Sequence, residues 1–277
     1  MPWSVAAAST QHVLITGASS GLGLAIARAF ALAGSKVALV ARDGERLAQA
    51  ADLLVSQDNV PRENLLTIAA DITQPADVER MAIETHEQWE KLDVLVNCAG
   101  KSTRGRIEDI TPEDFQELWN INFLAAVRCT RELLPLLLES KGHVVQIGSL
   151  AAKGASKYLG AYPASKFPLA AYSQQLRLEL GPRGLHVLLV CPGPLLRDDA
   201  GQRYAAQAGD LPESAKKPGG GVKIKGIDPA VLAQRILRAC ERRQAELVMP
   251  AKARILFVLN QLWPSLGDWL TNRMTGG

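Results

Sequence analysis

Tyr162 and Lys166 stand four residues apart at the start of a predicted helix over 161–180, so their side chains share one helix face. A lysine ammonium beside a phenol favours the phenolate and lowers the pKa of the phenol. Such a tyrosine can release and recover a proton near neutral pH. Ser149 follows a predicted strand over 143–148, where its hydroxyl could hold a carbonyl oxygen. These residues predict acid–base chemistry on a carbonyl or an alcohol.

A glycine-rich turn follows the first predicted strand, 12–16, and opens the next helix. Gly17 permits a tight turn off the strand, Gly21 leaves room for a pyrophosphate, and Gly23 lets the helix pack closely on the sheet. The helix N-terminus offers N–H groups and the positive end of a dipole to phosphates. The spacing predicts a dinucleotide site, with a glycine turn that binds no ligand as the alternative. The other residues of this predicted site are Ser19, Ser20 and Leu22.

The end of the second predicted strand, 36–41, should select the nucleotide. An acidic residue there binds the ribose 2′-hydroxyl of NAD, whereas an arginine accommodates the 2′-phosphate of NADP. The strand ends at Ala41, and Arg42 follows with a guanidinium that can pair with a phosphate. The sequence therefore favours NADP(H) over NAD(H). Asp43 remains the ribose partner if the strand ends later, and a solvated Arg42 is the other alternative.

Short β-branched runs alternate with longer helical periods along the chain. Strands are predicted at 12–16, 36–41, 65–70, 92–97, 143–148, 185–190 and 246–250. Helices are predicted at 22–34, 43–57, 75–90, 112–140, 161–180 and 229–242. Strands this apolar are typical of a parallel sheet buried on both faces. We predict one α/β domain over 1–277, a Rossmann-type doubly wound parallel β-sheet of order 3-2-1-4-5-6-7 with helices on both faces.

Several predicted strands end in polar or small residues. In open α/β sheets, ligands bind at these carboxyl ends. Taken singly, each such residue could equally be a helix cap or part of a turn. The residues assigned to the cofactor site on this ground are Asp71 and Ile72 after the third strand, Asn97, Ala99 and Gly100 at the fourth, and Pro192 and Gly193 after the sixth.

The order of these motifs resembles the short-chain dehydrogenase/reductase family: TGASSGLG, NCAG, Asn122, Ser149 and YPASK. The resemblance covers residues 12–193. It implies that Tyr162 exchanges a proton with the substrate oxygen and that Ser149 orients this oxygen. It implies that Lys166 lowers the pKa of the tyrosine and holds the nicotinamide ribose. For Asn122 it implies a bound water that links Lys166 to solvent.

The chain departs from the family pattern near the expected cleft. Arg197 stands where the family often has a threonine that contacts the cofactor carboxamide, which leaves the cofactor orientation open at that contact. Lys101 follows the NCAG motif, either as a contact for an acidic substrate or as a solvated surface lysine. Asn120 is the alternative to Asn122 if the helix register differs by two residues.

Two segments fall outside the alternation of strands and helices. Residues 194–227 are long and polar, and we interpret them as a substrate lid. The lid carries four lysines that could recognise a phosphorylated or carrier-bound acyl substrate: Lys216, Lys217, Lys223 and Lys225. The alternative is that the lid is a charged loop in contact with solvent. The apolar C-terminal extension, 251–277, could cover the substrate cleft or pack in a core or subunit interface. It could also lie as a helix on a membrane surface, with headgroups near Lys252, Arg254 and Arg273.

The composition excludes several classes of protein. The chain has 277 residues, 47% of them hydrophobic, and a net charge of +3, which gives no basis for nucleic-acid binding. Four cysteines without a CxxC or Cys/His cluster predict neither a metal site nor a disulfide framework. With neither a secretory signal nor an apolar run long enough to span a bilayer, we expect a cytoplasmic location.

We therefore expect an NADP(H)-dependent oxidoreductase that reversibly reduces a lipophilic ketone or aldehyde, with Tyr162 as general acid and base. A reductase of 3-oxoacyl thioesters is the alternative within the enzyme class. A binding protein that senses NADP without turnover is the alternative outside it, and Tyr162→Phe separates the two. The resemblance also implies a homodimer or homotetramer with the helices at 112–140 and 161–180 in its interface.

Overall fold

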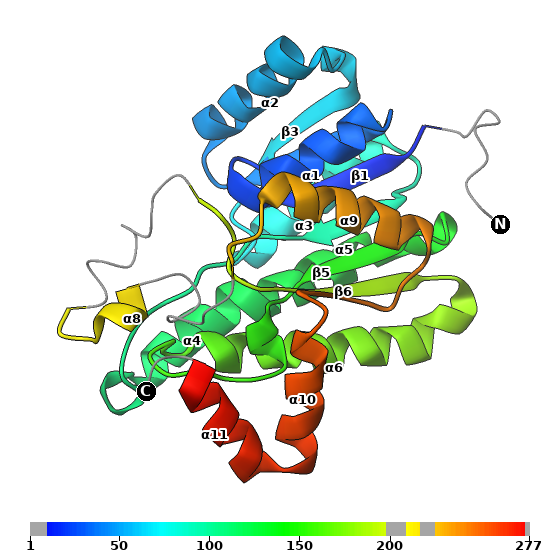
Figure 1. Cartoon of the computed structure of the whole chain (residues 1–277). Helices are drawn as coiled ribbons and strands as arrows, with labels where there is room; N and C mark the ends of the chain where they lie inside the picture. Colours follow the sequence, from blue (N-terminus) through cyan, green and yellow to red (C-terminus); the bar gives the residue numbers. More distant parts are fainter. Residues whose placement is uncertain (1–9, 198–208, 217–224, 275–277) are drawn as a thin grey trace.

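The computed structural model describes residues 10–197, 209–216 and 225–274. In this part of the chain, parallel strands form one sheet of order β3-β2-β1-β4-β5-β6-β7 (Figure 1). The strands are β1 His12–Thr16, β2 Lys36–Ala41, β3 Leu65–Ala69, β4 Val94–Asn97, β5 His143–Ile147, β6 His186–Pro192 and β7 Glu246–Met249. The predicted strand order and doubly wound fold are confirmed.

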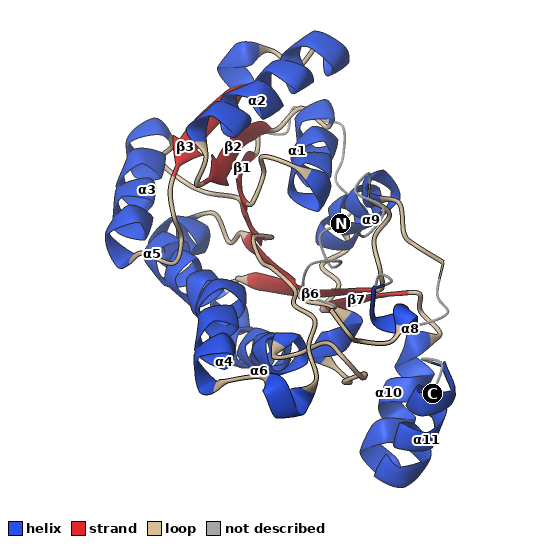
Figure 2. Cartoon of the chain, turned by 90° about the vertical axis from the view of Figure 1, so that its left-hand side faces the viewer, coloured by secondary structure: helices blue, strands red, loops and turns tan. Residues whose placement is uncertain are grey.

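Helices cover both faces of the sheet (Figure 2). One face carries α1 Gly21–Leu32, α2 Gly44–Asp58 and α9 Pro229–Glu241, and the other carries α3 Pro75–Gln88, α5 Ala125–Glu139 and α6 Tyr162–Leu180. Successive strand residues enter opposite cores, so that Val13 and Ile15 pack toward α1 while Leu14 packs toward α3. This is why the strands consist of continuous apolar runs.

The helical region predicted over 112–140 is not one regular helix. α4 Pro112–Trp119 begins with a capping box, in which Thr111 accepts from the Asp114 N–H and Asp114 accepts from the Thr111 N–H. A π-helical segment over Asn120–Leu124 separates α4 from α5. This wider turn carries Asn122, whose side chain is buried. Single π turns inside helices often occur at functional sites.

The C-terminal extension forms two helices. α10 Ala253–Leu262 ends at Trp263, and α11 Pro264–Met274 follows at once. Pro264 has no N–H to continue the hydrogen bonding of α10, so the chain turns there. The two helices form a hairpin that projects from the body at the bottom of Figure 1.

The described parts of 194–227 are held in place by one contact between the two ends of the segment and by one contact with the body. Where the segment starts and ends, the Leu196 N–H donates to the Ile227 carbonyl and the Ile227 N–H donates to the Pro194 carbonyl, each at 2.8 Å. Farther along, α8 Glu213–Lys216 receives the buried Arg104, whose Nε donates to the Ala215 carbonyl at 2.8 Å. The segment therefore begins and ends at one place on the sheet.

His143 and His186 meet at the amino ends of β5 and β6, the edge of the sheet away from the predicted site. Their Nδ1 atoms are 2.8 Å apart, and His186 Nε2 lies 2.9 Å from the Gln244 carbonyl. His186 therefore donates through Nε2 and accepts at Nδ1 from His143, with both rings neutral. Burial lowers the pKa of His143 to about 3 and that of His186 to about 4.

This pair predicts acid sensitivity. Between pH 6.5 and about 4 the unfolded rings bind protons that the folded rings do not, so the free energy of unfolding should fall as the pH falls. Each ring contributes at most about 1.4 kcal/mol per pH unit. Urea unfolding across this range measures the slope, which His143→Leu/His186→Leu should flatten and the exposed control His86→Asn should not. If the double variant kept the wild-type dependence of the unfolding free energy on pH, His143 and His186 would not be the source of the acid sensitivity.

Candidate active site

Three predicted catalytic residues lie on two elements that pack together, the turn after β5 and the start of α6. Lys166 follows Tyr162 by one turn of α6, and its Nζ donates to the carbonyl of Ile147 at 3.0 Å. Ser149 lies two residues beyond this carbonyl, and its hydroxyl accepts a main-chain N–H at 3.1 Å from the short turn over 150–152. This turn packs against α6. The end of one strand and the start of one helix thus position the three side chains together.

The lysine of this group is buried. Lys166 is 5% exposed, and burial lowers the pKa of its ammonium to about 8. The group therefore remains mostly protonated at neutral pH. A positive charge held away from water stabilises an anion beside it more strongly than an exposed charge does. The environment of Lys166 suits the stabilisation of a phenolate.

Cys98 lies close to the same charge. Burial raises the pKa of its thiol to about 12, although the positive charges of Lys166 and Arg197 oppose this change. A thiol with so high a pKa is not a nucleophile at neutral pH. The same electrostatic contact places the charge of Arg197 near the site, at the position where the family often has a threonine.

Asn122 ties the loop after β4 to the start of α6. Its Oδ1 accepts from the Lys101 N–H at 2.9 Å, and its Nδ2 donates to the Lys101 carbonyl at 2.8 Å and to the Ser165 hydroxyl at 2.9 Å. The Ser165 hydroxyl donates in turn to the Tyr162 carbonyl at 2.7 Å. The amide of Asn122 thereby fixes the backbone that carries the tyrosine.

The structure distinguishes the two candidate asparagines. The Oδ1 of Asn120 accepts from Arg128 at 2.8 Å, away from the lysine. Asn122 instead lies against Gly100, where a Cβ would be 2.6 Å from the Asn122 Oδ1 and 3.4 Å from the Lys166 Nζ. Asn122, and not Asn120, is therefore the asparagine close to Lys166.

Sequence reasoning missed two residues that organise the site, Thr16 and Ser165. Thr16 ends β1, and its hydroxyl accepts from the N–H groups of Cys98 and Ala99 at 3.1 and 3.2 Å. It thereby fixes the loop after β4 against the glycine turn. The available signals were a hydroxyl at the end of an apolar strand and a serine inside the YPASK motif.

The glycine turn is packed too tightly for side chains. Gly17 has a φ of +71°, and a Cβ there would lie 2.9 Å from the Ala99 Cα. A Cβ on Gly23 would lie 2.1 Å from the Gly17 carbonyl oxygen, so the helix approaches the turn as closely as backbone permits. At Gly21, in contrast, a Cβ would meet no described heavy atom within 4 Å. The turn therefore leaves open space at the helix start.

The first turn of α1 is suited to an anion. Ser20 is the N-cap, and within the described part of the chain its side chain makes no capping hydrogen bond, and the first turn holds no acidic residue. The N–H groups there are thus available to phosphate oxygens. The Leu22 side chain is buried in the core and Ser19 is half-buried, so Leu22 can contribute only its backbone. The residues present fit a dinucleotide pyrophosphate.

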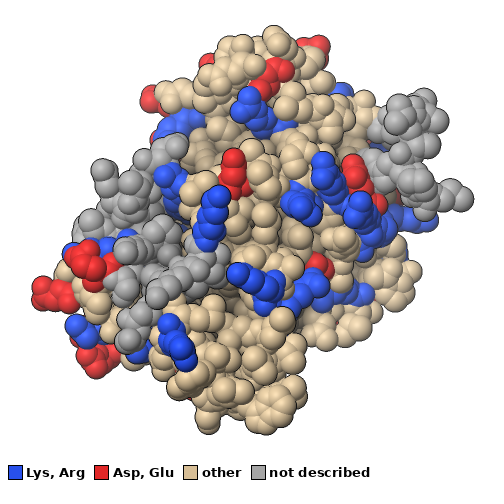
Figure 3. Space-filling model, viewed as in Figure 1, with Lys and Arg blue, Asp and Glu red and all other residues tan. Residues whose placement is uncertain are grey.

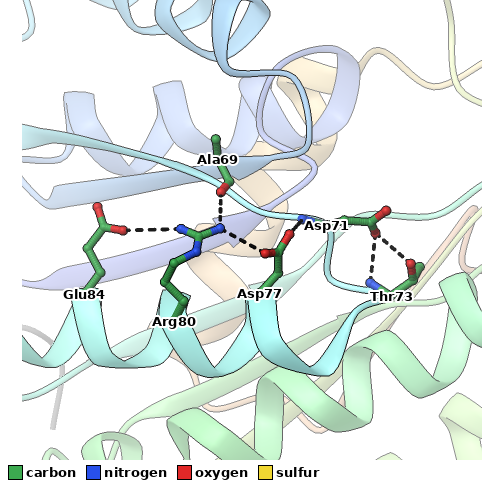
Figure 4. Close-up of polar contacts among 6 residues, drawn as sticks. All are labelled: Ala69, Asp71, Thr73, Asp77, Arg80 and Glu84. Atoms are coloured by element: carbon green, nitrogen blue, oxygen red, sulfur yellow. Dashed lines mark hydrogen bonds and ion pairs between the residues drawn. The ribbon is translucent and has the colours of Figure 1, made fainter.

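Asp71 and Ile72 lie in a fixed turn after β3 (Figure 4). Asp71 Oδ1 accepts from the Thr73 N–H and hydroxyl at 3.0 and 2.8 Å, and the Asp71 N–H donates to Asp77 at 2.7 Å. That bond, together with the Arg80 guanidinium, lowers the pKa of Asp77. The Ile72 side chain is buried in the core. The turn therefore presents mainly its backbone and the Asp71 carboxylate.

Asn97 directs its side chain away from the glycine turn. Its Nδ2 donates to the Thr130 hydroxyl on α5 at 3.0 Å. The end of β4 therefore offers Ala99, Gly100 and backbone atoms to a ligand. At the end of β6, the Gly193 N–H donates to the Met249 carbonyl at 2.7 Å, and Pro192 pairs with the same residue.

The structure also distinguishes the residues after β2. The Asp43 carboxylate caps α2 by accepting from the Arg46 N–H at 3.0 Å. Arg42 lies exposed in the bend between β2 and α2. Because the carboxylate is engaged by the helix, Arg42 is the better placed of the two to meet a ribose substituent.

The lysines considered for acidic substrates have other neighbours. Lys101 forms an ion pair with Glu117 on α4, and Lys216 forms one with Glu213 within α8. Lys225 is exposed. The two remaining lid lysines lie outside the described residues: Lys217 and Lys223. The ion pairs favour the interpretation of Lys101 and Lys216 as surface residues.

Comparison with known proteins agrees with this geometry. The short chain dehydrogenase family model matches residues 11–207. Dehydrogenase/reductase SDR family member 7B from Danio rerio is 33% identical over 258 residues, 92% of this chain and 82% of that protein. A ketoacyl reductase from a Nostoc species is 29% identical over 267 residues, 92% of this chain and 86% of that protein.

Solved structures show the same similarity. L-sorbose reductase from Gluconobacter frateurii, crystallised with NADPH and L-sorbose, aligns with a TM-score of 0.75 at 28% identity, over 87% of this chain and 95% of that one. The family model covers more than half of the chain. The chain therefore belongs to the short-chain dehydrogenase/reductase family and is a dehydrogenase/reductase enzyme.

Proposed function

We propose that this enzyme is an NADP(H)-dependent carbonyl reductase that converts a lipophilic ketone or aldehyde to the alcohol and can run in reverse. The observation that carries the proposal is that the end of β5 and the short turn after it, which carries Ser149, pack against α6, which begins with Tyr162 and anchors Lys166 to the Ile147 carbonyl. When bound, the reduced nicotinamide supplies the hydride that adds to the carbonyl carbon. Tyr162→Phe, argued in the Discussion, tests the proposal.

The residues of the site then supply the proton, orient the substrate and stabilise the phenolate. Tyr162 donates its phenolic proton to the carbonyl oxygen, which becomes the hydroxyl of the product. The Ser149 hydroxyl orients this oxygen. The buried ammonium of Lys166 stabilises the phenolate left on Tyr162 and holds the nicotinamide ribose. The phenolate must recover a proton before the next turnover.

Asn122 serves that recovery. Asn122 and Lys166 both lie next to Gly100, which supports a role for Asn122 in holding a water that links the lysine to solvent. Protons then pass from solvent through this water and Lys166 to Tyr162. In the reverse direction the same groups carry the proton outward.

The residues proposed for the cofactor site would hold it at the carboxyl ends of the strands. N–H groups of the glycine turn hold the pyrophosphate. The residues proposed to bind the cofactor are Gly17, Ser19, Ser20, Gly21, Leu22, Gly23, Arg42, Asp71, Ile72, Asn97, Ala99, Gly100, Tyr162, Lys166, Pro192 and Gly193. For Leu22, Ile72 and Asn97, whose side chains face other parts of the protein, the contact is through the backbone.

Arg42 gives the preference for NADP(H). The capping bond of Asp43 and the NADPH bound to the sorbose reductase support this assignment. Arg42→Ala should weaken NADPH binding about tenfold, since it removes charge-assisted hydrogen bonds at an exposed site. NADH binding should stay unchanged. Fluorescence transfer from tryptophan to the nicotinamide measures both affinities.

A matched control is Arg62→Ala, which removes an equally exposed arginine that pairs with Asp52 instead. It should bind both nucleotides as the wild type does. Equal weakening of NADPH and NADH by Arg42→Ala, or no weakening of either, would contradict the role of Arg42.

Reduction of 3-oxoacyl thioesters is the second candidate, because the Nostoc relative is a ketoacyl reductase. The ion pair of Lys216 with Glu213 favours the lipophilic ketone instead, since it neutralises a lysine that would meet a phosphorylated carrier. The ratio of kcat/KM for a cyclic aliphatic ketone to that for a 3-oxoacyl thioester separates the candidates. A ratio above one supports our proposal.

We further propose that one domain over 1–277 assembles as a homodimer or homotetramer in the cytoplasm. The exposed apolar residues on α4 and α6 support the assembly: Trp119, Phe167 and Leu178. All four cysteines are free thiols, as is usual in a reducing compartment. No helix in the described ranges is long and apolar enough to cross a bilayer.

A further inference from the structure

The hairpin of α10 and α11 is a firmly packed projection. Ala253 and Phe257 anchor α10 to the core cluster that contains Leu169 and Val248. α11 packs on α10 so closely that a Cβ on Gly267 would overlap the Asn260 side chain. Figures 1 and 2 both show the hairpin extending away from the sheet, with the turn between its helices at the far end.

The outer surface of this hairpin is apolar. Three of its exposed residues follow helical spacing along α10, and three more lie at the turn and along α11. Each is between 43% and 66% exposed. We refer to the three around the turn, Leu262, Trp263 and Leu266, as the apolar tip, and Ile255, Val258 and Trp269 continue this surface toward the body. A cluster of exposed apolar side chains on one projection is typical of a contact with a protein or a membrane.

Cations lie at the opposite end of the hairpin. Because the helices are antiparallel, Lys252 and Arg254 before or at the start of α10 stand at the same end as Arg273 near the end of α11. Arg254 donates to the Glu246 carbonyl at 3.1 Å, and the Arg273 guanidinium lies 5.4 Å from the Trp269 ring. Asp268 is the one acidic residue in the sequence over 251–274.

The surface view agrees with this separation. In Figure 3, the lobe at the bottom of the molecule, where Figure 1 places the hairpin turn, is tan, and blue side chains lie above it. From Arg254 to Leu262 the helix rises about 12 Å. The hydrocarbon of one leaflet is about 15 Å thick, half of the whole core. The spacing thus places the cations at the headgroups when the tip is in the acyl region.

The charges on the hairpin favour a lipid surface over a second copy of the chain as the binding partner of the apolar tip. A contact between the tips of two copies would give the three cations at the other end of the hairpin no negative charge to pair with. An anionic lipid surface neutralises them. Tryptophans beside cations are typical of the boundary between headgroups and acyl chains. We propose that the α10–α11 hairpin docks the enzyme on an anionic lipid surface, with the apolar tip inserted and Lys252, Arg254 and Arg273 at the headgroups.

Flotation of the full chain with vesicles tests the proposal. Wild-type protein should bind vesicles of phosphatidylcholine with phosphatidylserine and bind much less to phosphatidylcholine alone. Leu262→Ser/Leu266→Ser should weaken binding at least about tenfold, because two leucines no longer leave water. Lys252→Gln/Arg273→Gln should weaken binding to the anionic vesicles about fivefold for each cation removed.

The matched control is Leu32→Ser/Ile83→Ser, which removes two equally exposed apolar residues from α1 and α3. It should float as the wild type does. NADPH binding, measured without lipid, should be the same in all variants, so failure here leaves the proposed function intact. Absence of wild-type binding to anionic vesicles, or equal loss in the control, would overturn the proposal. The proposal would also be overturned if Leu262→Ser/Leu266→Ser converted an oligomer to a monomer in the absence of lipid. That result would show that the tip contacts a second copy of the chain.

Discussion

Tyr162→Phe should lower kcat by about 10²- to 10⁴-fold, the usual contribution of a positioned general acid. The phenyl ring fills the same space at the start of α6, but it has no proton for the carbonyl oxygen. The Kd for NADPH should stay within about twofold of the wild type, because the ring and all the other residues proposed to bind the cofactor remain in place. Steady-state turnover of a ketone, combined with a fluorescence titration of NADPH, measures both quantities.

Tyr172→Phe is the control for this variant. Tyr172 lies on the same helix, is half-buried and hydrogen-bonds to Thr130, so its loss tests the removal of a phenol hydroxyl in general. Its turnover should match that of the wild type. If Tyr162→Phe retained the wild-type kcat, the proton would have to come from another group, and the proposed mechanism would be wrong.

Gly23→Ala should weaken NADPH binding about tenfold to a hundredfold. The added Cβ would lie 2.1 Å from the Gly17 carbonyl oxygen, a backbone atom that cannot rotate away. Relief requires the helix start to move from the turn, at a cost of about 1–3 kcal/mol. The N–H groups proposed to hold the pyrophosphate move with it. A fluorescence titration measures the affinity, and circular dichroism checks that the fold is retained.

Gly44→Ala supplies the comparison for that substitution. Gly44 starts α2, and a Cβ there would meet only the Ala69 side chain at 3.7 Å, an ordinary contact. This variant should bind NADPH as the wild type does. Wild-type affinity in Gly23→Ala would show that the turn does not hold the cofactor.

The regular part of the fold could be predicted from the sequence because it depends on local patterns. β1 and β2 have the bounds predicted for them, since the apolar residues inside each strand are buried on both faces of the sheet. The π-helical segment over Asn120–Leu124 could not be predicted in this way. Asn122 sits there because its amide bonds to Lys101, 21 residues earlier. Periodicity within a helix carries no record of such a partner.

The site residues also differ in how far they could be predicted from local sequence patterns. The YPASK motif places Tyr162 and Lys166 on one face by local geometry alone. Ser165 and Thr16 were missed because their roles depend on distant partners: Asn122 lies 43 residues from Ser165, and Cys98 lies 82 residues from Thr16. A hydroxyl in the sequence does not state which backbone or amide group it will meet.

The choice between Arg42 and Asp43 needed the end of a strand to within one residue. Sequence patterns do not fix element boundaries that finely. The structure ends β2 at Ala41, and Asp43 then caps α2. In the C-terminal extension, Pro264 was a sufficient signal for two helices, because its ring cannot continue α10.

Transfer of deuterium tests the central claim most directly. The enzyme is incubated with NADPH that carries deuterium at the transferable position and with a panel of lipophilic ketones, and the alcohols are analysed by mass spectrometry. We predict deuterium on the carbinol carbon of at least one product with the wild type, and its loss with Tyr162→Phe. Tight binding of NADPH with no deuterium transfer to any ketone in the panel would contradict a carbonyl reductase.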